Sequence, residues 1–169
     1  MFLFQQEKNF KMQIMIFKYC LTVSGDHFIP DDMLPLIKEK YLLVGKSNPN
    51  DKENSKSDFR YGLGYASFFH PKKFATEDFI VEYNEWFVSF IKSNKTLFFA
   101  MGVNDLSIYI EVYFDGGQCN FEIFKKEQLL EILNVNISFP VSIYLLKKRE
   151  LREWEIEITK EWKPKLSET

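Results

Sequence analysis

Two sets of regularly spaced acidic residues have the types and spacing best suited to a chemical role. The first set recurs at i, i+4 and i+7, which places its carboxylates on one face of a helix. It consists of Asp78, Glu82 and Glu85. The second set alternates with apolar residues, as on one face of a strand. It consists of Glu153, Glu155 and Glu157. Rows of carboxylates attract basic protein partners, although a solvated helix face or a charged edge strand shows the same pattern.

The sequence gives little support for catalysis or metal binding by histidine. His27 and His70 are its only histidines, and Asp26 precedes the first of them. An enzyme using Asp26 and His27 would need a nearby nucleophile, and the neighbouring sequence supplies none. No Cys or His pair has metal-ligand spacing either. We therefore interpret both histidines as surface turn residues, and we predict a protein without catalytic residues, metal or cofactor.

Composition narrows the class of partner. The formal net charge is −2, whereas nucleic-acid-binding domains are usually basic. The one dense basic cluster, residues 147–149 with Arg152, is better explained as a solvated turn than as a nucleic-acid site. No apolar run approaches the ~20 residues that span a bilayer. The two cysteines, Cys20 and Cys119, suggest reduced thiols and a cytoplasmic protein. We expect neither nucleic acid nor membrane as a partner.

The first half of the chain predicts strands around one helix. Alternating apolar residues indicate a strand over 12–24. Asp31 or Asp32 is a plausible N-cap for a helix that continues to about residue 41. Residues 45–60 are polar and rich in turn formers, which favours a mobile surface loop, and 61–70 returns as a strand.

The second half begins with the clearest helix pattern, over residues 76–93. Its apolar face consists of Phe79, Ile80, Tyr83, Phe87, Phe90 and Ile91. Thr76 is its candidate N-cap. A hairpin over 106–123, a short helix over 127–133 and a strand over 141–147 follow. Residues 151–162 fit either a strand or a helix, and we favour a strand that pairs with 141–147.

These elements predict an α+β fold in a single domain, with an antiparallel or mixed sheet and helices packed on one face. Residues 1–11 form a flexible N-terminal extension in this interpretation, 12–147 the α+β domain, and 148–169 a C-terminal strand and tail. Met12 or Met15 is an alternative start.

The order of several short motifs resembles a known family. The stretch 19–26 (Tyr-Cys-Leu-Thr-Val-Ser-Gly-Asp), then Pro30 and a short helix, resembles the opening of the bacterial family catalogued as domain of unknown function 4279. The later segments that agree are 61–65, the helix with Trp86, a hairpin, 124–130 and 141–144. Tyr61 and Tyr65 stand where such families have a tryptophan-bearing strand. The resemblance implies a small bacterial protein, of which some neutralise toxins, and it carries no catalytic residues.

We therefore expect a non-catalytic binding protein, with an immunity-type inhibitor that masks a basic toxin as its specific role. The acidic sets at 78–85 and 153–157 are the expected contact surface. The alternative is a ligand-sensing or regulatory domain with a small-molecule pocket between the sheet and the 45–60 loop. The sequence does not determine the oligomeric state.

Overall fold

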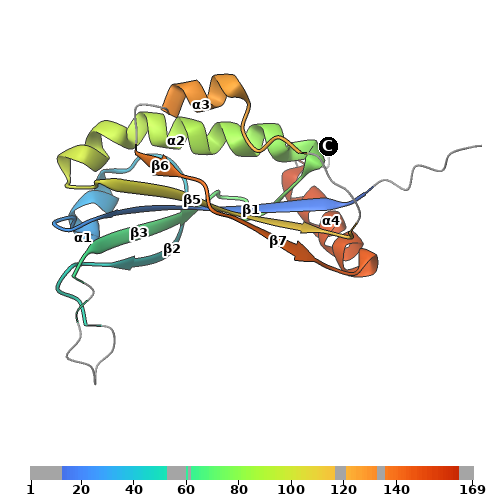
Figure 1. The fold of residues 1–169 in the computed structure, drawn as a ribbon, viewed down its shortest axis with the longest axis horizontal. Coiled ribbons are helices and arrows are strands. Elements are labelled where there is room, and N and C mark those ends of the chain that lie inside the picture. The colour runs from blue at the N-terminus through green and yellow to red at the C-terminus, as the bar shows by residue number, and fades with distance from the viewer. Residues whose placement is uncertain (1–12, 53–59, 61, 117–120, 133–135, 164–169) are drawn as a thin grey trace, which may run out of the picture.

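The computed structural model describes residues 13–52, 60, 62–116, 121–132 and 136–163, so the predicted extension at 1–11 lies outside the described residues. These residues form one mixed sheet with helices packed against it (Figure 1). The strands are β1 (Met15–Gly25), β2 (Leu42–Ser47), β3 (Gly64–Phe69), β4 (Ala75–Thr76), β5 (Asp105–Phe114), β6 (Ile137–Ser138) and β7 (Val141–Leu145). The helices are α1 (Pro30–Met33), α2 (Ile80–Ala100), α3 (Lys126–Ile132) and α4 (Lys148–Trp162), with 3-10 turns η1 (Leu34–Leu36) and η2 (Glu77–Phe79).

Strand β1 is the centre of the sheet, whose order is β2-β3-β1-β5-β6. It pairs antiparallel with β3, β4 and β5, and β5 in turn pairs in parallel with β6 and β7. The predicted α+β fold with a mixed sheet is therefore confirmed.

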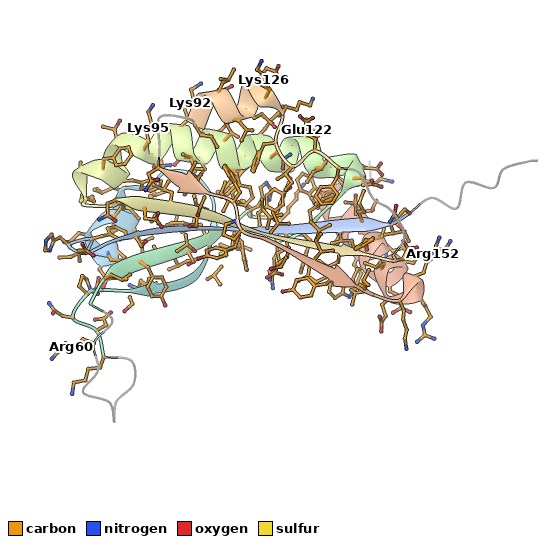
Figure 2. All side chains as sticks on the ribbon, in the orientation of Figure 1. Arg60, Lys92, Lys95, Glu122, Lys126 and Arg152 are labelled. Atoms are coloured by element: carbon orange, nitrogen blue, oxygen red, sulfur yellow. The ribbon has the colours of Figure 1, made fainter. Side chains whose placement is uncertain are left out.

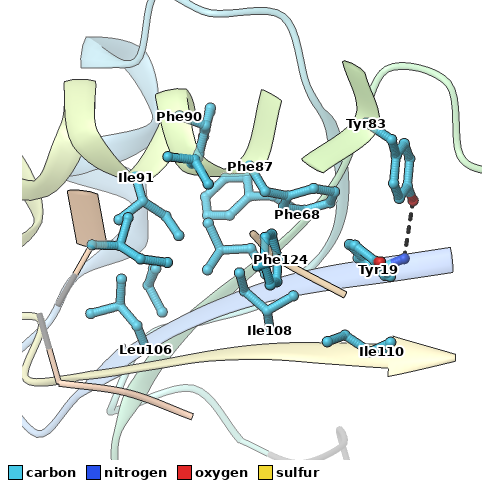
Figure 3. Packing of buried hydrophobic residues seen from close by; sticks show 14 of the residues in the cluster. Tyr19, Phe68, Tyr83, Phe87, Phe90, Ile91, Leu106, Ile108, Ile110 and Phe124 are labelled. Atoms are coloured by element: carbon cyan, nitrogen blue, oxygen red, sulfur yellow. Dashed lines mark hydrogen bonds between the residues drawn. The ribbon is translucent and has the colours of Figure 1, made fainter. Parts of the chain in front are cut away.

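The core lies between β1 and α2, as the alternating and helical patterns predict. From β1, side chains such as Tyr19 and Leu21 are fully buried beneath the helix. From α2, Tyr83, Phe87 and Ile91 pack down on them (Figure 3). The backbone N–H of Tyr19 donates to the Tyr83 hydroxyl at 3.0 Å, which ties the helix to the strand.

The C-terminal segment corrects the sequence interpretation, because residues 148–162 form helix α4 and not a strand. Leu151 and Ile158 are seven residues apart and are both buried against Ile14 and Ile16 of the β1 segment. A strand would have put Ile156 on the same face as Ile158, but Ile156 is 55% exposed. Helix α4 lies at the end of the sheet where β1 begins (Figure 1).

Four other element predictions are also wrong in part. Helix α1 ends at Met33 and is followed only by the 3-10 turn η1 to Leu36, and its N-cap is Ile29, because Pro30 takes the first helical position. The first residues of the proposed loop, 45–47, belong to strand β2, which pairs with β3. Of the return strand proposed for the hairpin, residues 121–123 are not strand, because β5 pairs with β6 and β7 on that edge. Cys119 lies outside the described residues. Helix α2 continues beyond the predicted end at 93, to Ala100.

Two glycines permit close backbone packing at the far end of β1. Gly25 and Gly64 face each other across β1 and β3. A Cβ atom on Gly64 would lie 1.8 Å from the carbonyl oxygen of Phe28, and one on Gly25 would lie 2.1 Å from that of Gly102. The backbone carbonyls of Phe28 and Gly102 therefore approach the strand ends at a distance that only glycine allows.

Candidate functional site

Two residues of the first acidic set lie in the first turns of α2, and the third precedes the helix. Asp78 is in η2, Glu82 and Glu85 are in α2, and all three are exposed. Farther along the same helix the charges change sign, since the exposed Lys92 and the half-buried Lys95 lie on its outer side (Figure 2). The negative charge is thus confined to the first half of the helix.

The second acidic set does not form one row. In a helix Glu153 and Glu157 are one turn apart, whereas Glu155 points to the opposite side. Glu153 faces Arg149 with an Nε–Oε1 distance of 3.6 Å on the exposed side. The prediction of a shared strand face for these three residues is wrong, because the segment is helical.

One member of each predicted set meets in a cavity between the start of β1, η2 and α4. We call it the acidic cavity, and its volume is about 140 Å³. Its lining residues are Gln13, Ile14, Met15, Thr76, Glu77, Asp78, Arg152 and Glu155. Three carboxylates and one guanidinium leave it with a formal charge of −2.

The position of α4 creates this cavity. At the end of the helix the indole nitrogen of Trp162 donates to the carbonyl oxygen of Phe74 at 2.8 Å. The Trp162 ring stacks on Phe79, with 5.0 Å between centroids. With Leu151 and Ile158 buried, these contacts hold Glu155 against the start of η2.

The acidic cavity raises the proton affinity of Glu77. Burial raises the pKa of Glu77, and the charges of Asp78 and Glu155 raise it further. Opposite charge placed in the cavity would relieve this repulsion, so its electrostatics favour a cation.

A second hollow continues the acidic surface toward α3. It has a volume of about 350 Å³ and includes Glu85, Lys125, Glu127 and Glu131 in its lining. Glu131 accepts from Lys92 at 2.9 Å across the gap between the two helices. Negative charge therefore extends from the acidic cavity along α2 to α3, with lysines at its border.

His70 is buried, so the interpretation of this histidine as a surface turn residue is wrong. It is 8% exposed and stacks on Trp162 with 5.3 Å between ring centroids. The Lys72 backbone N–H donates to its Nδ1 at 2.8 Å when the ring is neutral. Burial and, to a smaller extent, the Lys72 charge lower the pKa of His70 to about 4, whereas the backbone carbonyl oxygen of Lys72, 2.9 Å from Nδ1, acts in the opposite direction because it can accept from the protonated ring. No spacing in the sequence predicts the burial of His70, because Trp162, which stacks on its ring, is remote in the sequence.

The Asp26 and His27 pair lies at the other end of the sheet, where both residues are exposed. They line an open hollow of about 570 Å³ together with Ile29, residues 48–50 and Gly62. Across its rim, Asn48 donates to Asp31 at 2.8 Å. Residues 48–50 belong to the 45–60 loop, beside which the alternative, ligand-sensing interpretation expects a pocket.

The described part of the chain has neither a metal-binding cluster nor a membrane-spanning helix. No three His, Cys, Asp or Glu residues there are grouped to hold a metal ion. Among the same residues, no helix combines the length and the apolar character that crossing a bilayer requires.

No protein-family model, curated protein or solved structure matches this chain. The resemblance to domain of unknown function 4279 therefore stays a prediction.

Proposed function

We propose that this chain is a non-catalytic protein-binding domain that captures a basic partner through the surface around the start of α2. In the form suggested by the bacterial resemblance, it is an immunity-type inhibitor that masks a toxin. The contact surface consists of Asp78, Glu82 and Glu85, with Glu155 at its edge.

The observation that carries the proposal is the meeting of Asp78 and Glu155 in the acidic cavity. Carboxylates from two distant segments converge there, and Glu77 adds a third. Carboxylates that lie close together destabilise the folded protein unless an opposite charge offsets their repulsion. A partner that supplies this opposite charge is the simplest reason for the arrangement.

The rigidity of the surface suits such binding. Glu82 and Glu85 project from a helix whose opposite face is fully buried in the core. A partner would therefore meet carboxylates that lose little backbone freedom on binding, which favours affinity.

Reversing the charge of the surface tests the proposal. The triple variant Asp78→Lys, Glu82→Lys, Glu85→Lys should keep its fold, because exposed substitutions shift stability by about 0.5 kcal/mol each. Its association with a basic partner captured from the native host should slow by about tenfold at low salt, since exposed charge steers encounter. The measurement is association rate at low and high salt, beside a denaturant melt.

A matched control changes the same charge elsewhere. Asp26, Asp32 and Asp105 are exposed near the opposite end of β1, and their reversal to Lys should leave the association rate nearly unchanged. If both triple variants slow association equally, only net charge matters and the α2 surface is not the contact. Equal rates for wild type and the α2 variant at both salts would reject the proposal.

A second candidate function rests on the hollow beside Asp26 and His27. Its volume of about 570 Å³ falls within the ~300–1,000 Å³ of small-molecule sites. We expect a bound metabolite to raise the melting temperature of the wild type and to lose that effect in Ile29→Glu, because Ile29 lines the hollow. A thermal-shift screen of host metabolites measures this, and an equal shift in the variant would place the ligand elsewhere.

A further inference from the structure

The acidic cavity contains a buried polar side chain that lacks a partner. Thr76 lines the cavity and is 4% exposed, and its hydroxyl has no hydrogen-bond partner in the described structure. The sequence predicts this hydroxyl as a helix N-cap, but no cap hydrogen bond forms. Native proteins rarely leave such an atom unpaired, so the cavity has capacity for a ligand that donates hydrogen bonds.

Gln13 contributes a further acceptor. Its Nε2 donates to the carbonyl oxygen of Gly116 at 2.8 Å. That bond uses the donor end of the amide, which leaves its oxygen as the available group. Because Gln13 also lines the cavity, carboxylate, hydroxyl and amide oxygens gather around one small volume.

Arg152 is the only basic residue that lines the cavity, and its guanidinium is not the hydrogen-bond donor that these acceptors lack. It is exposed at the α4 end of the molecule (Figure 2). It forms no ion pair with these carboxylates among the described residues. The cavity therefore keeps its negative charge and its acceptors.

We propose that the acidic cavity binds the guanidinium group of an arginine side chain of the protein partner, an inference that rests on the proposed function. Its volume of about 140 Å³ is well above the ~10–15 Å³ that one water needs, so the cavity is large enough for a planar guanidinium group. A guanidinium offers five donors in a planar fork, which suits acceptors that come from several directions. No metal-binding group includes these residues in the described structure, so an organic cation fits better than a metal ion.

Methylguanidinium is the direct probe, because it is the group itself without a protein. Titrated into the full chain and followed by amide NMR, it should shift the signals of residues 76–78 and 152–155 to saturation. Tetramethylammonium carries the same charge but no N–H donors, and it should not saturate at the same concentrations. Equal responses to the two cations would show simple ion screening and overturn the inference.

Substitutions then locate the site. Glu155→Gln should raise the Kd for methylguanidinium by about tenfold, because it removes a charge-assisted hydrogen bond. Thr76→Val keeps the shape of Thr76 and should raise the Kd by about threefold. Asp32→Asn makes the same charge change at an exposed position outside the cavity and the contact surface, and it should alter the Kd by less than about twofold. An equal effect of Asp32→Asn and Glu155→Gln would overturn the inference.

Arg152→Gln separates two roles for that residue. If the partner supplies the guanidinium, this variant should bind methylguanidinium at least as tightly as the wild type, because a repelling charge is gone. A loss of binding as large as that of Glu155→Gln would show that Arg152 is part of an anion site and would overturn the inference.

The same variants distinguish failure of this inference from failure of the proposed function. If methylguanidinium does not bind but the α2 triple variant still slows partner association, the proposed contact surface is supported and the guanidinium site is rejected. If the probe binds in the cavity but neither Glu155→Gln nor the α2 triple variant affects partner association, both the arginine-capture role and the proposed contact fail.

Discussion

Replacing Phe87 with Ala should lower the free energy of unfolding by about 3–5 kcal/mol. Phe87 is fully buried at the centre of α2. Its ring packs against Tyr19, Tyr83 and Trp86 at centroid distances of 5.5, 5.3 and 4.8 Å. Truncation would leave a cavity that these rings cannot fill without leaving their own positions.

Phe99→Ala provides the matched control for this measurement. It makes the same substitution in the same helix, but Phe99 is 46% exposed. We expect a cost below about 1 kcal/mol, since surface substitutions usually have small effects. Urea denaturation of both variants and the wild type measures the difference. Equal losses for the two variants would mean that Phe87 is not part of the core.

Lowering the pH should destabilise the protein through His70. The pKa of His70 is about 4 in the folded protein, against an ordinary value of 6.5. Between these values the unfolded chain binds a proton that the folded protein does not, so acid favours unfolding. This contribution to stability is complete above about pH 6.5 and is lost as the pH falls toward 4. Its size is on the order of 3 kcal/mol.

The structural cause lies in the packing around the ring. Tyr83, Trp86 and Trp162 surround His70, so a charged imidazolium would lose its water. The positive Lys72 side chain lies over Trp162, 4.2 Å from its ring centroid. The carbonyl oxygen of Lys72, 2.9 Å from Nδ1, is an acceptor that offsets part of this cost once the ring is protonated.

His70→Phe keeps the stacking and removes the titration. Denaturant melts at several values between pH 7 and pH 4 should show a steeper loss of stability in the wild type than in this variant, by about 2–3 kcal/mol over the range. The comparison of slopes is independent of any constant cost of the substitution. Parallel slopes would show that His70 is already solvated in the folded protein.

Local periodicity by itself determined the two elements that build the core. The alternation of apolar residues over 15–23 predicts a strand buried on one face, and the spacing from Phe79 to Ile91 predicts the helix that covers it. Both are confirmed, because burying one face of an element needs only a pattern within that element. Glu82 and Glu85 lie in α2 and are exposed, as the same spacing predicts, whereas Asp78 precedes the helix in η2.

Tertiary contacts alone decided the C-terminal helix, the acidic cavity and the burial of His70. Residues 151–162 carry both a strand and a helix pattern, and the choice depended on Ile14 and Ile16, which the helix covers with Leu151 and Ile158. Once α4 lies there, Glu155 meets Asp78 beside Thr76, and Trp162 covers His70. These pairs are far apart along the chain, and no local spacing encodes a contact that forms only when two remote surfaces pack together.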